Sequence, residues 1–143
     1  MPRSKGSPIA LHVDSRAERP QVEMFTEFRF EAAHRLPHVA PDHMCARLHG
    51  HSYQVRITVT GPVDTQVGWV MDFADIARAS EPLRLRLDHR LLNEIEGLEN
   101  PTCERLATWL WERLQPAISL LSAVEVREMP GLGCIYRGPG PSV

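Results

Sequence analysis

The stretch FTEFRFEAAH, residues 25–34, carries an apolar, aromatic or imidazole side chain at every second position: Phe28, Phe30, Ala32 and His34. Arg29 and Glu31 stand between them. Successive side chains of a β-strand point to opposite faces of a sheet, so a period of two predicts a half-buried strand. This strand is expected to end on His34.

A second alternating stretch, HSYQVRITVTG at residues 51–61, places these residues on one face: His51, Tyr53, Val55, Ile57 and Val59. His49 shares this face if the strand begins two residues earlier. The segment between the two strands, RLPHVAPDHMCARL at residues 35–48, contains two prolines and is long for a connection inside a compact domain. Long loops are often functional. The pattern therefore favours a hairpin with a functional loop at its end.

The period becomes helical in DFADIARASEPLRLRLDHRLLNEI, residues 72–95, where these residues recur at helical spacing: Phe73, Ile76, Ala77, Ser80, Leu83 and Leu87. Pro82 is expected to kink this helix or restart it. A second helix is predicted in residues 100–116, capped by Asn100 or Thr102, ended by Pro116, with a buried stripe of Leu106, Trp109, Leu110 and Leu114.

Two further strands are predicted in SAVEVREM, residues 122–129, and in GCIYRG, residues 133–138. The order strand, strand, helix, helix, strand, strand predicts an α+β fold in which a four-stranded antiparallel sheet carries two helices on one face. The edges of so small a sheet are usually blunted or paired with another subunit, so we expect a homo-oligomer.

The length of 143 residues suits one domain, which we place at residues 24–143, after a mobile tail at residues 1–23. The formal net charge of −2 gives no footprint for nucleic acid or for an anionic membrane surface. The apolar runs are too short to span a bilayer. Three cysteines form no pairing pattern, which favours a reducing cytoplasm over a disulfide framework.

Three histidines are predicted to converge where the first two strands meet. His49 and His51 are two residues apart on one strand, so their Cα atoms would lie about 6.5 to 7 Å apart on the same face. Hairpin pairing would bring His34 beside them. One histidine on an apolar face is usually a core residue, but three on converging faces indicate a metal site. Three neutral imidazoles with an open position are typical of catalytic zinc, and iron is less favoured without a carboxylate ligand.

Cys45 lies in the loop, four residues before His49. It could serve as a base or nucleophile beside the metal, or as a fourth ligand that closes a structural site. The remaining histidines, His12, His38 and His43, are interpreted as ordinary polar residues. Cys103 and Cys134 are interpreted as packing residues.

Two further carboxylates are candidate site residues. Asp88 precedes His89 and could orient it in a proton relay, although a solvated acid beside a histidine at a helix end explains the same pattern. Glu128 continues the apolar face of Val124 and Val126, so its carboxylate needs a partner. That partner could be an arginine, or a ligand that presents two parallel N–H groups.

Five segments, FEAAHRLPH, CARLHGHSYQV, LDHRLLN, ENPTCE and GCIYRG, resemble the 6-pyruvoyl-tetrahydropterin synthase family, over residues 25–138. The likeness is greatest to its bacterial queuosine-pathway branch, which forms 6-carboxytetrahydropterin. The chain departs from the family pattern at Cys103 and in MPGLG, where a proline could reshape the turn next to Glu128. The resemblance implies the tunnelling T-fold and a hexamer built as a dimer of trimers, with active sites at subunit contacts.

The resemblance also implies residue roles. Zinc would be held by His34, His49 and His51, with Cys45 as the catalytic base. His89 would belong to the relay beside Asp88, and Glu128 would anchor the pterin and take part in the relay. The implied substrate is 7,8-dihydroneopterin triphosphate, and the implied products are 6-carboxytetrahydropterin, acetaldehyde and triphosphate. A 6-pyruvoyl product and a non-catalytic, zinc-stabilised binding module remain as alternatives.

Overall fold

The computed structural model describes residues 19–140. Most of the tail predicted at residues 1–23 therefore lies outside the described residues. The first strand, β1 (Gln21–His34), already includes the last three of those tail residues, and Gln21 pairs with Pro62.

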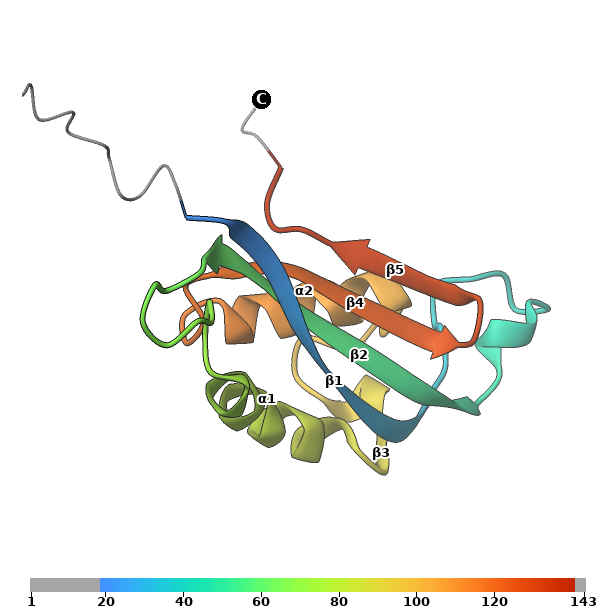
Figure 1. Cartoon of the computed structure of the whole chain (residues 1–143). Helices are drawn as coiled ribbons and strands as arrows, with labels where there is room; N and C mark the ends of the chain where they lie inside the picture. Colours follow the sequence, from blue (N-terminus) through green and yellow to red (C-terminus); the bar gives the residue numbers. More distant parts are fainter. Residues whose placement is uncertain (1–18, 141–143) are drawn as a thin grey trace, which may run out of the picture.

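Five strands form one sheet in the order β3-β1-β2-β4-β5 (Figure 1). The antiparallel strands are β1, β2 (His49–Pro62), β4 (Leu121–Met129) and β5 (Leu132–Tyr136). These are the four predicted strands, and the expected α+β architecture is confirmed. The sheet also contains β3 (Arg90–Leu91), which pairs with β1 in parallel and was not predicted. A two-residue strand has no alternating pattern to detect.

Two helices pack on one face of the sheet. α1 (Phe73–Leu87) contacts β1, and α2 (Cys103–Leu114) contacts β4 and β5 (Figure 1). Pro82 lies inside α1 without ending it. The buried residues of α1 are Ile76, Ser80, Leu83 and Leu87, whereas Phe73 is 59% exposed. The predicted stripe was thus too wide, because Phe73 and Ala77 are both exposed at its margin.

The core lies between the helices and the inner face of the sheet. Its buried side chains include Phe30, Tyr53, Val55, Ile57, Val59, Leu106, Trp109, Leu110, Leu114, Val124 and Val126. The side chain of Thr102, one of the two predicted caps of α2, accepts a hydrogen bond from the backbone N–H of Arg105. This cap fixes where α2 begins. The helix begins two residues after Pro101, whose backbone carbonyl contacts His34.

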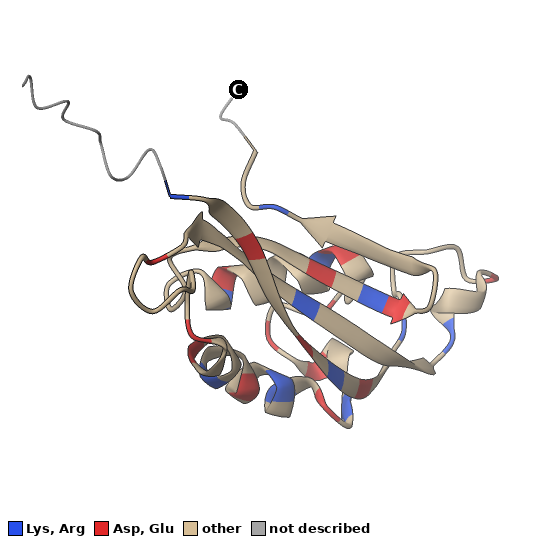
Figure 2. Ribbon diagram, in the orientation of Figure 1, with Lys and Arg blue, Asp and Glu red and all other residues tan. Residues whose placement is uncertain are grey.

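The outer face of the sheet is charged. Arg56 forms ion pairs with Glu27 at 2.7 Å and with Glu125 at 3.8 Å, so one row of alternating charge crosses β1, β2 and β4 (Figure 2). Among the described residues, no helix is long and apolar enough to cross a membrane.

Candidate metal centre and active site

The end of the β1–β2 hairpin brings the three predicted histidines together. His34 pairs with His49, and Ala32 pairs with His51, so the three rings leave one face of neighbouring strands. One ring nitrogen from each histidine lies within 4.8 Å of the others. His34 is 1% exposed. The predicted convergence at the mouth of the long loop is therefore confirmed.

Backbone carbonyl groups determine which ring nitrogens carry protons. His34 Nδ1 lies 2.8 Å from the carbonyl oxygen of Pro101, and His49 Nδ1 lies 2.7 Å from that of Arg47. A carbonyl oxygen only accepts hydrogen bonds, so each Nδ1 must donate and each Nε2 of a neutral ring keeps its lone pair. Burial lowers the pKa of His34, which favours its neutral ring.

The two Nε2 atoms of His34 and His49 face each other at 3.0 Å. Two unprotonated nitrogens cannot share a hydrogen bond, so their facing lone pairs favour a cation between or beside them. Two ligands at about 2.0 to 2.1 Å from one tetrahedral zinc lie about 3.3 Å apart. The observed spacing is close to that of two imidazoles sharing one metal ion.

His51 supplies the third donor. Its Nε2 is buried and makes no hydrogen bond, and the nearest acid is Glu128, whose Oε2 lies 3.8 Å away. Buried polar atoms are nearly always paired, so an unpaired nitrogen beside two convergent lone pairs fits the role of a metal ligand. The donor set of three neutral imidazoles fits a metal ion.

Two residues that orient His34 were not singled out from the sequence. Pro101 acts through its backbone carbonyl, and the Tyr53 hydroxyl oxygen lies 3.2 Å from His34 Nδ1. Such partners of the second ring nitrogen fix the tautomer and orientation of a metal-binding histidine. The sequence pattern places Tyr53 only on the face of its strand that carries His51, and a backbone carbonyl carries no side-chain signal at all. The only sequence signal for Pro101 is its place in the segment ENPTCE, one of the five segments that carry the family resemblance.

Replacement of Tyr53 by phenylalanine is expected to weaken metal binding by about tenfold, the low end of the range for such outer partners, because Pro101 still accepts the Nδ1 proton. The phenylalanine ring can keep the stack on Phe30, whose centroid lies 4.7 Å from that of Tyr53. Competition with a metallochromic chelator measures the change. Equal metal affinity in wild type and variant would show that the hydroxyl does not orient the ring.

Cys45 shares a cavity with the histidines. The cavity has a volume of about 320 Å³ and is lined by His34, Leu36, Met44, Cys45, His49, His51, Glu128, Met129 and Leu132. Cys45 lies in the short helix η1 (Met44–Ala46). Its backbone N–H donates to His43 Nδ1 at 3.0 Å, and its carbonyl accepts from the backbone N–H of Leu36 at 2.8 Å. His43, interpreted as an ordinary loop residue, therefore caps the turn that carries Cys45.

Glu128 reaches the same cavity through an irregularity in the sheet. The register between β4 and β5 shifts between Arg127 and Met129, so Glu128 is an extra residue opposite β5. Such bulges re-aim side chains next to functional sites. Pro130 and Gly131 close the hairpin that follows, and the φ of 87° at Gly131 suits the third position of a type II turn with proline at the second. The proline flagged in MPGLG thus belongs to the turn beside the bulge.

Asp88 and His89 lie elsewhere. Asp88 ends α1 and accepts a hydrogen bond from the backbone N–H of Glu31 at 2.9 Å, which is the main reason why its pKa is lowered; His89 Nδ1, 3.0 Å away, lowers it further. The His89 side chain is 78% exposed, and its φ of 57° is left-handed. His89 lines a second hollow, of about 470 Å³, that also includes Glu31, Ser52 and His51.

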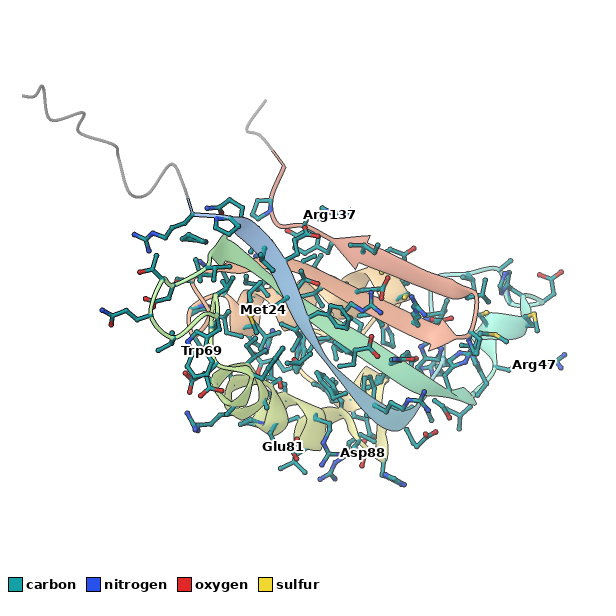
Figure 3. All side chains as sticks on the ribbon, viewed as in Figure 1. Met24, Arg47, Trp69, Glu81, Asp88 and Arg137 are labelled. Carbon is teal, nitrogen blue, oxygen red and sulfur yellow. The ribbon has the colours of Figure 1, made fainter. Side chains whose placement is uncertain are left out.

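Figure 3 labels Asp88 at the end of α1, beside β3. Within the described part of one chain, the cavity of the three histidines is lined by Cys45 and Glu128 but not by Asp88 or His89.

Comparisons with known proteins agree on one family. The family profile described as 6-pyruvoyl tetrahydropterin synthase matches residues 23–139. A 6-carboxy-5,6,7,8-tetrahydropterin synthase of Synechocystis is 41% identical over 122 residues, which cover 81% of this chain and 93% of the relative. A protein of the same name from Bacillus subtilis is 30% identical over 127 residues, or 80% and 84% of the two chains.

A solved structure with the same fold is that of Caenorhabditis elegans 6-pyruvoyl tetrahydropterin synthase. It superposes with a TM-score of 0.78 at 28% identity, covering 85% of this chain and 98% of that chain.

Proposed function

Because the chain belongs to the 6-pyruvoyl tetrahydropterin synthase family, we propose that it converts 7,8-dihydroneopterin triphosphate to 6-carboxytetrahydropterin, releasing acetaldehyde and triphosphate. The observation that carries this proposal is the cavity in which three histidine donors, one thiol and one carboxylate meet. The choice of product rests on the relatives from Synechocystis and Bacillus that are named for it. The product would then serve queuosine biosynthesis, as the sequence resemblance implies.

The metal we propose is zinc, held by His34, His49 and His51. When bound, zinc would act as a Lewis acid toward the side-chain hydroxyls of the substrate, which makes the neighbouring carbon–hydrogen bonds more acidic. Three imidazoles without a carboxylate ligand are typical of zinc in catalytic sites. The three donors that converge within 4.8 Å of one another are all nitrogens, which supports zinc over magnesium or calcium.

The other residues of the cavity supply binding and proton transfer. Glu128 would accept two N–H bonds from the pterin edge, which fixes the ring relative to the histidines. Cys45, as a thiolate, would remove the proton from the side-chain carbon next to the ring. Elimination then releases triphosphate. A carbon–carbon bond of the substrate side chain is then cleaved, which consumes one water molecule. This step leaves a carboxylate on the pterin and releases acetaldehyde.

His89 would contribute to the proton relay only at the cavity of a neighbouring chain, because it lies outside the cavity of its own chain. Asp88 would then position the His89 ring through the 3.0 Å contact to Nδ1. This proposal agrees with active sites at subunit contacts, which the sequence resemblance implies. The three unpaired cysteines support a cytoplasmic location.

The test of the proposed reaction is product analysis. The purified protein, loaded with zinc, is given 7,8-dihydroneopterin triphosphate, while alcohol dehydrogenase and NADH report acetaldehyde and mass spectrometry reports the pterin. We expect acetaldehyde and 6-carboxytetrahydropterin in equal amounts. A pyruvoyl product without acetaldehyde would instead assign the 6-pyruvoyl reaction, and zinc binding without turnover would indicate a binding module.

Replacement of Glu128 by glutamine is expected to weaken substrate binding by about one to two orders of magnitude without loss of metal. Glutamine keeps the shape but turns one acceptor oxygen into a donor that opposes the N–H groups of the pterin, a change of about 1 to 3 kcal/mol or more. Glu125→Gln is the matched control, because Glu125 lies on the same strand and pairs with Arg56 and Arg127 on the outer face. Equal substrate affinity in the two variants would remove the anchoring role of Glu128.

We propose that the chain assembles through the edges of its sheet into a hexamer of two trimers. Among the described residues, β3 covers only Ala32 and Ala33 of β1, and β5 pairs only with β4. Large apolar residues are exposed on the part of β1 that β3 leaves uncovered and on β5: Val22, Phe25, Leu132 and Ile135. Light scattering at micromolar concentration is expected to give the mass of six chains. A fully active monomer would contradict assembly.

A further inference from the structure

The side chain of Asn93 binds both backbone polar groups of Arg35, the residue that follows His34. Its Oδ1 accepts a hydrogen bond from the Arg35 N–H at 3.0 Å, and its Nδ2 donates to the Arg35 carbonyl oxygen at 2.8 Å. Only one orientation of the carboxamide satisfies both bonds, because an N–H must donate and a carbonyl oxygen must accept. Asn93 therefore gives Arg35 the two bonds that a neighbouring strand would otherwise supply.

Asn93 lies where the pairing of β1 with β3 ends. In this parallel pairing, Ala33 lies beside Leu91 (Figure 1). Two residues further along, the same register would place Arg35 beside Asn93, but the chain has by then entered the short helix η2 (Leu92–Glu94). The backbone of a helical turn cannot continue a strand ladder. The side chain of Asn93 extends the edge of the sheet past His34 in its place.

The carboxamide of Asn93 also reaches the segment that orients the His34 ring. Its Nδ2 donates a second hydrogen bond, to the carbonyl oxygen of Glu99 at 3.3 Å. Glu99 lies two residues before Pro101, whose carbonyl oxygen lies 2.8 Å from His34 Nδ1. One side chain thus connects the residue after His34 with the segment that carries the hydrogen-bond partner of its ring.

These hydrogen bonds close a ring that contains His34. Asn93 joins Arg35 to Glu99, and Pro101 joins back to the His34 imidazole. The chain itself completes the ring, because His34 precedes Arg35 and Glu99 precedes Pro101 by two residues. Each bond in such a ring limits the movement of the others. Without Asn93, the bond between His34 and Pro101 would form less often, and the Nε2 lone pair would be less firmly aimed at a metal ion.

We propose that Asn93 is a positioning residue of the candidate metal centre, which holds the His34 ring against the Pro101 carbonyl and so increases metal affinity. The proposal rests on the proposed three-histidine site but not on the proposed reaction. Loss of a direct outer partner of a ligating histidine typically costs about 10- to 100-fold in affinity. Asn93 acts one step further out, so its loss has a smaller effect, of about three- to tenfold.

Zinc release tests this role. Asn93→Ala removes all three hydrogen bonds of the carboxamide, and the zinc-loaded variant is expected to lose its metal to a chelator about three- to tenfold faster than wild type. Asn100→Ala is the matched control. Asn100 directly follows Glu99, and its side chain makes no hydrogen bond within the described part of the chain.

The control should release zinc at the wild-type rate. Equal rates for Asn93→Ala and Asn100→Ala, in proteins that both bind zinc, would overturn the role of Asn93 and leave the metal site intact. A wild-type protein that binds no zinc would overturn both. Neither result depends on turnover, so the proposed reaction is judged separately.

Cobalt(II) provides a measurement that a purely structural role of Asn93 would not change. It can replace zinc, and its visible d–d bands report the arrangement of the ligands around the ion. With saturating cobalt and unchanged circular dichroism, the bands of Asn93→Ala are expected to shift relative to those of Asn100→Ala. Identical cobalt spectra in the two variants would show that Asn93 does not orient a ligand.

Asn93→Asp keeps the proposal testable if the alanine variant does not fold. Aspartate has nearly the shape of asparagine and can still accept from the Arg35 N–H, but an ionised carboxylate has no hydrogen to donate to the carbonyl groups of Arg35 and Glu99. Its negative charge alone would hold a cation more firmly, so the direction of the change separates charge from orientation. We expect faster zinc loss than from wild type. An equal or slower loss would overturn the proposal.

Discussion

The protein with His34 replaced by alanine is expected to lose its metal and its turnover together. The substitution removes one of three nitrogen donors and leaves the Nε2 of His49 without the facing atom at 3.0 Å. It also leaves the Pro101 carbonyl without its donor in a buried position. Loss of a direct ligand should exceed the decrease of about 10- to 100-fold in affinity that is typical when only an outer partner is lost.

His38→Ala is the matched control, because His38 lies exposed in the loop just after β1 and outside the histidine cluster. Elemental analysis after dialysis, together with a turnover assay, measures both effects. The control should keep one metal ion per chain. A His34→Ala protein that kept a full complement of metal would refute the three-histidine site, whatever its activity.

Cys45→Ala is expected to keep the metal and the fold but to lose turnover by about 10²- to 10⁴-fold, the usual contribution of a general base. Three ring nitrogens, one from each histidine, lie within 4.8 Å of one another. They would form the metal site without the sulfur of Cys45. Circular dichroism and metal analysis establish that fold and metal are intact, and single-turnover kinetics measures the rate.

A second variant separates the possible roles of the thiol. Cys45→Ser keeps the shape, but a hydroxyl is a far weaker base at neutral pH, so its rate should stay close to that of Cys45→Ala. The opposite result for metal content would be decisive: if Cys45→Ala lost its metal with its fold unchanged, Cys45 would be a fourth ligand and the site a closed structural one.

The sequence predicted the histidine cluster because its three members obey the simplest rule of a sheet. Alternation placed His49 and His51 on the face of Tyr53, and hairpin pairing placed His34 beside them, as the register of β1 and β2 confirms. The same alternation indicated that Glu128 turns inward, and it does line the cavity. The bulge that gives Glu128 its place was not predicted, because it depends on how two strands pair rather than on the pattern of either strand.

Other features lay beyond the reach of the sequence for equally physical reasons. Pro101 acts through its backbone, and the two residues of β3 are too few to show a period. The Sγ atoms of Cys103 and Cys134 lie 3.5 Å apart, a contact that depends on how α2 settles against β5 and that no local pattern encodes. The neighbouring residues Asp88 and His89 left a relay open as one interpretation, and the resemblance assigned His89 to it, but His89 does not line the cavity of its own chain.

The sequence separation of the site residues affects the order in which they come together as the chain folds. His34 and His49 are 15 positions apart, whereas His34 and Pro101 are 67 apart. Closing the longer loop costs about 1.3 kcal/mol more in chain entropy, so the hairpin can gather its histidines before α2 docks. The three histidines thus make contacts of low sequence separation, and the Pro101 carbonyl that fixes the tautomer of His34 arrives late. In a local opening that detached only the start of α2, the three histidines would stay together, but His34 would lose the carbonyl that orients its ring.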